Sequence, residues 1–234
     1  MMSSLLLKYN SSVEDKLRNF EKYVKRQALT RFIARYELFK KIINIKGSIV
    51  ECGVHHGGGL MAWAKLSAGL EPMALHRKII GFDTFEGFPS IDNKDVGIAA
   101  NESLKEGGFG TGYNSYDELL ESIKEFDDSR YLNQYPKVEL VKGDSNVTIP
   151  EYIKNNQHLI VALLFMDFDL YAPTKTALEY FLNRIPRGGI LAFDEINNSF
   201  WPGETIALLE QVGSLNNLNI QKFYFDPSIA YIVL

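Results

Sequence analysis

An apolar run that ends in two acidic residues constrains the fold of this chain most strongly. Residues 159–166, LIVALLFM, contain no polar side chain, and Asp167 and Asp169 follow directly. Such a run is typical of a strand that is covered on both faces, as the central strands of α/β sheets are. A buried helix would have the same composition, but Pro173 suits the first turn of a new helix over residues 174–183. We therefore predict a buried parallel strand, a short loop and a helix.

The position of Asp167 follows from that interpretation. In open α/β sheets, ligands bind beyond the carboxyl ends of the strands, which is where Asp167 falls. Asp169, two positions later, fits the cap of the following helix as well as it fits a function.

A glycine-rich stretch indicates a second unit of the same kind. Residues 47–59, GSIVECGVHHGGG, predict a strand that ends at Glu51 or Cys52, a glycine-rich turn, and a helix over residues 58–70. Glycine lets the backbone approach a ligand closely, and the start of a helix offers free N–H groups. The spacing matches the dinucleotide-binding pattern only in part, so an ordinary turn between strand and helix stays open.

Three further predicted strands also end in acids. The strand over residues 78–82 ends at Asp83, where a carboxylate can accept both hydroxyls of an adenosine ribose or can cap a helix. The strand over residues 138–142 leads to Asp144 and Ser145, and the strand over residues 190–193 leads to Asp194 and Glu195.

The remaining segments complete an α/β fold in a single domain, residues 1–234. Residues 12–44 predict two amphipathic helices, which can cover the sheet, form an oligomer interface or roof a pocket; packing is the commonest use. Residues 1–46 are thus an N-terminal helical extension, and residues 47–234 are the core.

The polar, glycine-rich segment 89–136 is expected to be a lid over the substrate, with a helix capped by Ser115 and Glu118. Shorter predictions are a short helix that residues 152–156 close, a helix over 204–215, and an antiparallel hairpin of 220–225 with 230–234.

Composition narrows the class of partner. The chain has 234 residues, a formal charge of -4 and no clustered basic patch, which argues against nucleic acid or an anionic membrane as the partner. The one cysteine, Cys52, excludes an internal disulfide framework, and neither a signal peptide nor a membrane-spanning stretch is evident. We expect a cytoplasmic protein that forms a homo-oligomer and acts on a small molecule.

Three of the acids predict a cation site. Asp167, Asp194 and Glu195 lie at the carboxyl ends of predicted neighbouring strands, where clustered carboxylates repel one another. Such a group either shares protons or holds a cation, and an all-oxygen set suits Mg²⁺. Zinc is disfavoured because no Cys/His ligand set accompanies the acids.

Taken in order, the segments ECGVHHGGG, GFDTFEGFP, KGDS, LLFMDFDLYAPT, ILAFDE and WPGE resemble the macrocin O-methyltransferase (TylF-like) family, over roughly residues 47–209. This resemblance implies a Rossmann-like class I methyltransferase sheet, S-adenosylmethionine and Mg²⁺ as cofactors, and a sugar hydroxyl as the acceptor. It makes Asp167, Asp194 and Glu195 the metal ligands, with Asp167 also the general base. The implied cofactor-binding residues are Glu51, Gly53, Val54, His55, Gly58, Asp83, Thr84, Asp144, Ser145 and Asp167.

The chain departs from the family pattern at two places, and other acceptors and functions are open. Glu195 stands where many relatives have Asp, and His55-His56 stands where an aromatic-basic pair is frequent, so the role of the histidines is open. Other acceptors are a catechol-like or another small diol, since two vicinal oxygens can chelate a metal. Alternatives of other kinds are a nicotinamide-dependent oxidoreductase, which the glycine spacing disfavours, and a non-catalytic binding protein, which the retained acids disfavour.

Overall fold

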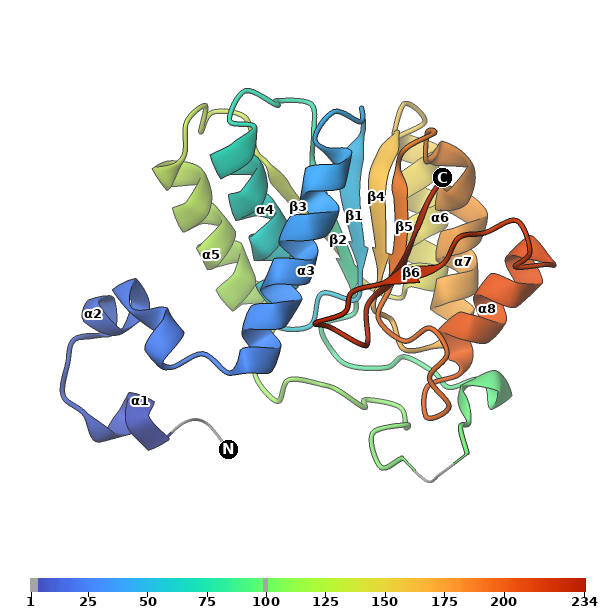
Figure 1. Ribbon diagram of the computed structural model, residues 1–234, viewed down its shortest axis with the longest axis horizontal. Helices are drawn as coiled ribbons and strands as arrows, with labels where there is room; N and C mark the ends of the chain where they lie inside the picture. Colours follow the sequence, from blue (N-terminus) through green and yellow to red (C-terminus); the bar gives the residue numbers. More distant parts are fainter. Residues whose placement is uncertain (1–3, 99–100) are drawn as a thin grey trace.

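The computed structural model describes residues 4–98 and 101–234, and it is built on one seven-stranded sheet (Figure 1). The strand order is β3-β2-β1-β4-β5-β7-β6. The bounds are β1 Ser48–Cys52, β2 Ile79–Asp83, β3 Val138–Lys142, β4 Val161–Met166, β5 Ile190–Phe193, β6 Gln221–Lys222 and β7 Ala230–Val233. Strands β1 to β5 pair in parallel, whereas β7 is antiparallel to β5 and β6 is antiparallel to β7. The mostly parallel sheet with a C-terminal antiparallel hairpin is confirmed, although β6 is only two residues long.

Helices cover both faces of the sheet (Figure 1). One layer contains α3 Arg26–Ile42, α4 Gly58–Leu70 and α5 Ser115–Ser129, and the other contains α6 Ser145–Asn155, α7 Tyr171–Phe181 and α8 Gly203–Val212. Strand β4 is apolar throughout because its residues alternate between two cores: Leu163 and Phe165 join the cluster beside the first layer, and Leu164 and Met166 join the cluster beside the second.

The strand order places the ligand edge. β1 and β4 are neighbours, and from them the chain proceeds outwards in both directions, to β2 and β3 on one side and to β5 on the other. Loops that leave the carboxyl ends of β1 and β4 therefore diverge to opposite faces, which opens a crevice between them.

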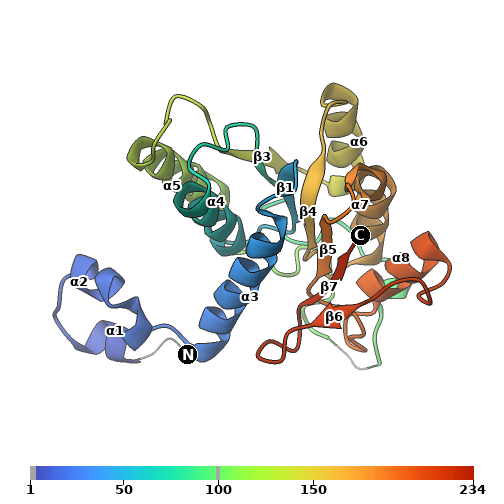
Figure 2. The ribbon, with the colours of Figure 1, turned by 45° about the horizontal axis from the view of Figure 1, so that its top comes forward.

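The N-terminal arm, residues 4–25, stands away from the sheet in both views (Figures 1 and 2). It contains α1 Ser4–Lys8, α2 Val13–Arg18 and the short 3-10 helix Phe20–Lys22. The two helices predicted over residues 12–44 are α2 and α3, but only α3 packs on the sheet. No helix in the described part of the chain combines the length and apolar character needed to cross a membrane.

The segment expected to be a lid divides into two parts. Helix α5 packs through Leu119, Ile123 and Phe126 into the core beside α3 and α4, so it is part of the helical layer. The described residues before it, 89–98 and 101–114, include the 3-10 helix Asn93–Asp95 and run along the ligand edge of the sheet (Figure 1).

Three helices begin or end at other residues than the sequence predicted. Asn114 caps α5, with its side chain accepting a hydrogen bond from the N–H of Asp117, whereas Ser115 is buried as the first helical residue. Helix α6 begins at Ser145 and continues through Pro150, where the sequence predicted only its last turn. Helix α8 stops at Val212 because Gly213 adopts a positive φ of 68°.

Candidate functional site

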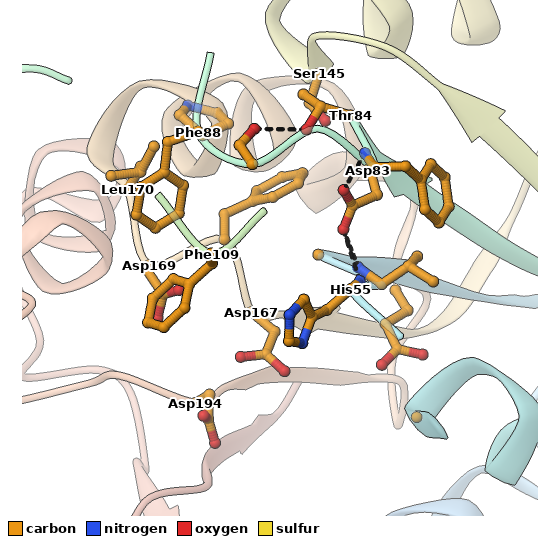
Figure 3. A pocket seen from close by; sticks show the side chains of 18 of the residues that line it. His55, Asp83, Thr84, Phe88, Phe109, Ser145, Asp167, Asp169, Leu170 and Asp194 are labelled. Carbon is orange, nitrogen blue, oxygen red and sulfur yellow. Dashed lines mark hydrogen bonds between the residues drawn. The ribbon is translucent and has the colours of Figure 1, made fainter. Parts of the chain in front are cut away.

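A pocket of about 420 Å³ lies at the carboxyl ends of β1, β2, β4 and β5. Asp167 and Asp194 lie at one end of this pocket, and Asp83, Thr84 and Ser145 lie at the other (Figure 3). The structure brings every residue predicted for the site to this one pocket: Glu51, Gly53, Val54, His55, Gly58, Asp83, Thr84, Asp144, Ser145, Asp167, Asp194 and Glu195.

Glycines allow the turn after β1 to lie flush against the end of β4. Gly53 has a φ of 95°, and a Cβ there would come within 2.0 Å of the carbonyl oxygen of Asp167. Gly57 has a φ of 82° as the N-cap of α4, and a Cβ on Gly58 would meet no atom within 4 Å. The turn therefore presents bare backbone and the start of a helix to the pocket, as a bound anion or nucleotide requires.

Asp83 joins the glycine-rich turn to the loop after β2. Its Oδ2 accepts hydrogen bonds from the N–H groups of Val54 and His55, both at 2.7 Å, and its Oδ1 accepts one from Phe85 at 2.6 Å. The next helical turn, at Asn93–Asp95, is capped by Asp92, so the alternative that Asp83 caps a helix is wrong. Beside Asp83, Thr84 donates to the carbonyl of Gly87 at 2.6 Å.

The far end of the pocket is the start of α6. Asp144 is the N-cap of this helix and accepts a hydrogen bond from the N–H of Asn146 at 2.9 Å. Ser145 is the first helical residue and is buried. The predicted Asp-Ser tip of β3 is thus a helix start whose two side chains face the ligand space.

Four carboxyl groups gather at the other end: Asp167 and Asp169 after β4, and Asp194 and Glu195 after β5. Burial raises the pKa of Asp167 well above its ordinary value, and Asp194 and Asp169 raise it further by repulsion. Burial, with Glu195 nearby, raises the pKa of Asp169 to about 8. These carboxyl groups therefore do not all ionise readily near neutral pH unless further positive charge is brought among them.

Asp169 does not cap α7, so the capping interpretation is wrong. The N-cap of α7 is Leu170, which makes no side-chain cap, and the N–H of Tyr171 donates instead to Asp95, at 2.6 Å from its Oδ1. Asp169 has a φ of 62° and lines the pocket beside Phe109 (Figure 3).

Two arginines from α3, which the sequence interpretation missed, supply positive charge. Arg31 forms an ion pair with Asp194, and Arg35 lies 3.6 Å from Glu51. Glu51 is buried at the end of β1, and this burial raises its pKa to about 7 although Arg35 opposes the shift. Their spacing of four positions puts both arginines on one helix face. That spacing was visible in the sequence, but the place where α3 crosses the sheet was not.

The donor set of the acidic end fits Mg²⁺. Asp167, Asp194 and Glu195 offer only oxygen, and their mutual repulsion would be relieved by a cation. Within residues 4–98 and 101–234, however, no three His, Cys, Asp or Glu side chains are arranged as a ligand set. Asp194 is turned to Arg31, whose guanidinium supplies the positive charge in this arrangement.

Aromatic rings form one wall near the acids. Phe88, Phe109 and Trp201 come from three loops, and their ring centroids lie 5.4 to 5.9 Å apart. His56 connects the glycine-rich turn to the same region, because its Nδ1 lies 2.8 Å from the hydroxyl of Tyr113 and the two rings stack.

An open parallel sheet with an antiparallel C-terminal hairpin, a glycine-rich turn after β1 and an acid after β2 defines the class I methyltransferase fold. Residues 24–207 of this chain match a protein family described as "Macrocin-O-methyltransferase (TylF)". The chain belongs to that family and is an O-methyltransferase.

Solved structures agree with this assignment. "CalS11, Calicheamicin Methyltransferase" is 31% identical, with a TM-score of 0.92 over 98% of this chain and 88% of that one. An apo structure of CalS11, titled a TDP-rhamnose 3'-O-methyltransferase in calicheamicin biosynthesis, is 29% identical, with a TM-score of 0.83 over 98% and 89%. The O-methyltransferase NovP, at 19% identity, shares the fold with a TM-score of 0.64 over 87% of this chain and 78% of that one. No curated protein sequence matches the chain.

Proposed function

We propose that this enzyme transfers a methyl group from S-adenosylmethionine to a hydroxyl of a sugar, either on a nucleotide deoxysugar or on a glycosylated natural product, with Mg²⁺ bound. The observation that carries the proposal is one pocket with a nucleotide-type end, built from the glycine-rich turn and Asp83, and an acidic end beside an aromatic wall. The similarity to CalS11, described as acting on TDP-rhamnose, supports a sugar acceptor.

The cofactor end uses backbone and three acids. Gly53 and Gly58 shape the turn at the methionine moiety, with Val54 and His55 beside it, and Glu51 faces that moiety from the end of β1. Asp83 and Thr84 hold the ribose, and Asp144 and Ser145 flank the adenine. S-Adenosylmethionine supplies an electrophilic methyl group on a sulfonium, so the task of these residues is to bind and orient it.

At the acidic end, Asp167, Asp194 and Glu195 would hold Mg²⁺, which would make the acceptor hydroxyl easier to deprotonate. Asp167 takes the proton of the acceptor hydroxyl. Asp169 lies at the same end with a pKa of about 8, so it is the second carboxyl to test as the base.

The acceptor lies against the aromatic wall. Phe88 and Phe109 line the pocket, and Trp201 packs on both rings. Flat apolar surfaces of this kind stack on the C–H face of a sugar while its hydroxyls reach the acids. A methyl-transfer screen over nucleotide deoxysugars, glycosylated macrolides and catechols tests this assignment, and transfer to catechols alone would contradict it.

Two variants separate the metal from the base. Asp167→Asn removes a ligand and the proton acceptor together, so we expect no turnover at any Mg²⁺ concentration, with the cofactor still bound. Glu195→Gln only weakens the cation site, so activity should return in part as Mg²⁺ is raised, by mass action. Initial rates across a Mg²⁺ titration, with calorimetry of S-adenosylmethionine as the control, measure both effects.

EDTA should abolish the methyl-transfer activity of the wild type, and added Mg²⁺ should restore it. Full activity under thorough chelation, or in Asp167→Asn, contradicts the metal-dependent mechanism. In that case Asp169→Asn, His55→Gln and His56→Gln are the next variants in which to look for the base.

We further infer a homo-oligomer. The N-terminal arm, residues 4–25, exposes Val13 and Leu17 on one face of α2, and these side chains are 72% and 69% exposed. An apolar face of this kind is typical of a helix that is covered by a partner chain.

A further inference from the structure

A buried carboxylate outside the pocket joins the two loops that carry the acids. Glu204, the second residue of α8, is 0% exposed. Its Oε1 accepts hydrogen bonds from the N–H groups of Phe168 at 3.1 Å and Asp169 at 3.3 Å, and its Oε2 accepts one from the N–H of Glu195 at 3.2 Å. Phe168 and Asp169 follow β4, and Glu195 follows β5. One side chain therefore spans the ends of two neighbouring strands.

Burying a charged carboxylate at Glu204 lowers the stability of the fold. No Lys, Arg or His within the described ranges forms an ion pair with it, so its partners are the three backbone N–H groups. A buried carboxylate without a cation partner is unfavourable for folding, whereas each of the three backbone N–H groups gains an acceptor from it.

The start of α8 packs closely against α7, and this packing places Glu204 between the two loops. A Cβ on Gly203 would come within 2.4 Å of Asp95 Oδ1 and within 2.5 Å of the nitrogen of Tyr171, which shows how closely α8 packs on the first turn of α7. On the other side of Glu204, Thr205 accepts a hydrogen bond from the N–H of Asn197 at 2.9 Å.

We propose that Glu204 is a positioning residue for methyl transfer, which holds Asp167 and Asp169 at a fixed separation from Asp194 and Glu195 without touching either reactant. Glu204 does not line the pocket. Its hydrogen bond to Asp169 supports the positive φ of that residue. Residues other than glycine adopt such a φ only under local constraint. The proposal rests on the proposed function for its catalytic consequence, but not for the loop geometry.

Three variants test the bridge. Glu204→Gln replaces one acceptor oxygen by a donor, so one loop loses its partner, and Glu204→Asp keeps the charge but is one methylene too short to reach both loops. Leu208→Val, in the buried face of the same helix, is the control for a general loss of stability.

Five quantities are measured on each variant. They are the hydrogen-exchange rates of the Phe168, Asp169 and Glu195 amides, the Mg²⁺ affinity without acceptor, the S-adenosylmethionine affinity, kcat and the acceptor KM. Both Glu204 variants should show faster exchange of these amides, and losses of about 10- to 100-fold in Mg²⁺ affinity and in kcat. Cofactor affinity and acceptor KM should stay close to the wild type. Leu208→Val should show a lowered melting temperature without these losses.

The outcomes separate the two proposals. Unchanged exchange at the three amides in Glu204→Gln, or equal losses in Leu208→Val, would overturn the positioning role. A wild type that neither binds Mg²⁺ nor transfers methyl groups would overturn the proposed function instead, while the exchange rates still decide the role of Glu204. If neither Glu204 variant folds, exchange in the wild type decides: slow exchange of the three loop amides supports the bridge, and fast exchange contradicts it.

Discussion

Asp83 illustrates how one side chain can build a site from two distant loops. Its carboxylate accepts hydrogen bonds from Val54 and His55, which precede it by 29 and 28 positions, and from Phe85 in its own loop. The left-handed conformation of His55, with a φ of 52°, is therefore held by an acid on the next strand. The shape of this end of the pocket therefore depends on Asp83.

Replacing Asp83 by Ala should weaken S-adenosylmethionine binding by roughly 1–3 kcal/mol, the scale of a hydrogen bond to a charged group. The free energy of unfolding should also fall, because three backbone N–H groups lose their acceptor. Calorimetric titration and chemical denaturation measure the two effects. Asp92→Ala is the matched control, since Asp92 caps a turn outside the pocket and should leave cofactor affinity unchanged. Wild-type affinity in Asp83→Ala would place the ribose acid elsewhere.

At the scale of elements, the start of α4 is shaped by two adjacent glycines with different tasks. Gly59 makes room for the ion pair between strand and helix, because a Cβ there would lie 2.0 Å from Glu51 Oε1 and 2.6 Å from Arg35 Nη2. A Cβ on Gly58 would meet no atom within 4 Å, and Gly58 lines the pocket.

The two glycines should respond oppositely to alanine. Gly59→Ala should lower the free energy of unfolding by about 1–3 kcal/mol, since the side chains of Glu51 and Arg35 are buried and would have to shift. Gly58→Ala should leave stability unchanged or raise it by up to about 1 kcal/mol, the ordinary effect of removing a helical glycine. Gly58→Ala should nevertheless bind S-adenosylmethionine more weakly, because the added methyl group occupies ligand space. Urea denaturation and calorimetry test the pair, and a stable Gly59→Ala would contradict the packing argument.

At the scale of the whole molecule, the arm of residues 4–25 is the part that the fold leaves unpacked. Helix α2 is six residues long and has no buried residue. A helix shorter than about 12 residues is marginal in water without tertiary contacts, so α2 is stable only if something covers its apolar face.

We expect Leu17→Glu to shift the protein towards smaller species in sedimentation velocity, because a charge would enter the contact between protomers. The unfolding of the dilute protein should change little, since Leu17 is 69% exposed within one chain. Ser11→Glu adds the same charge to the arm without removing an apolar group, and it should leave the oligomer intact. A wild type that remains monomeric at high concentration would show that the arm has another partner or none.

The sequence by itself determined the features that depend on neighbouring residues. The uninterrupted apolar run of β4 predicts a strand buried on both faces, and acids directly after strands predict a pocket at one edge of the sheet, because parallel strands all end on the same side. The glycine-rich turn and helix α4 are likewise local. For this reason the five parallel strands were found to within two residues, and every residue predicted for the site lines one pocket.

Only the tertiary structure decided which groups meet across the chain. The periodicity of α3 shows which face is apolar but not that Arg31 and Arg35 reach Asp194 and Glu51. Asp169 has the sequence context of a helix cap, yet Asp95, distant in the chain, takes the N–H of α7 and leaves Asp169 to the pocket. Glu204 looks like an ordinary acid in the first turn of a helix, and its bridge to Asp169 spans 35 positions. Contacts at such separations depend on how helices cross the sheet and on which loops come together, and neither propensity nor hydrophobic pattern encodes those distances.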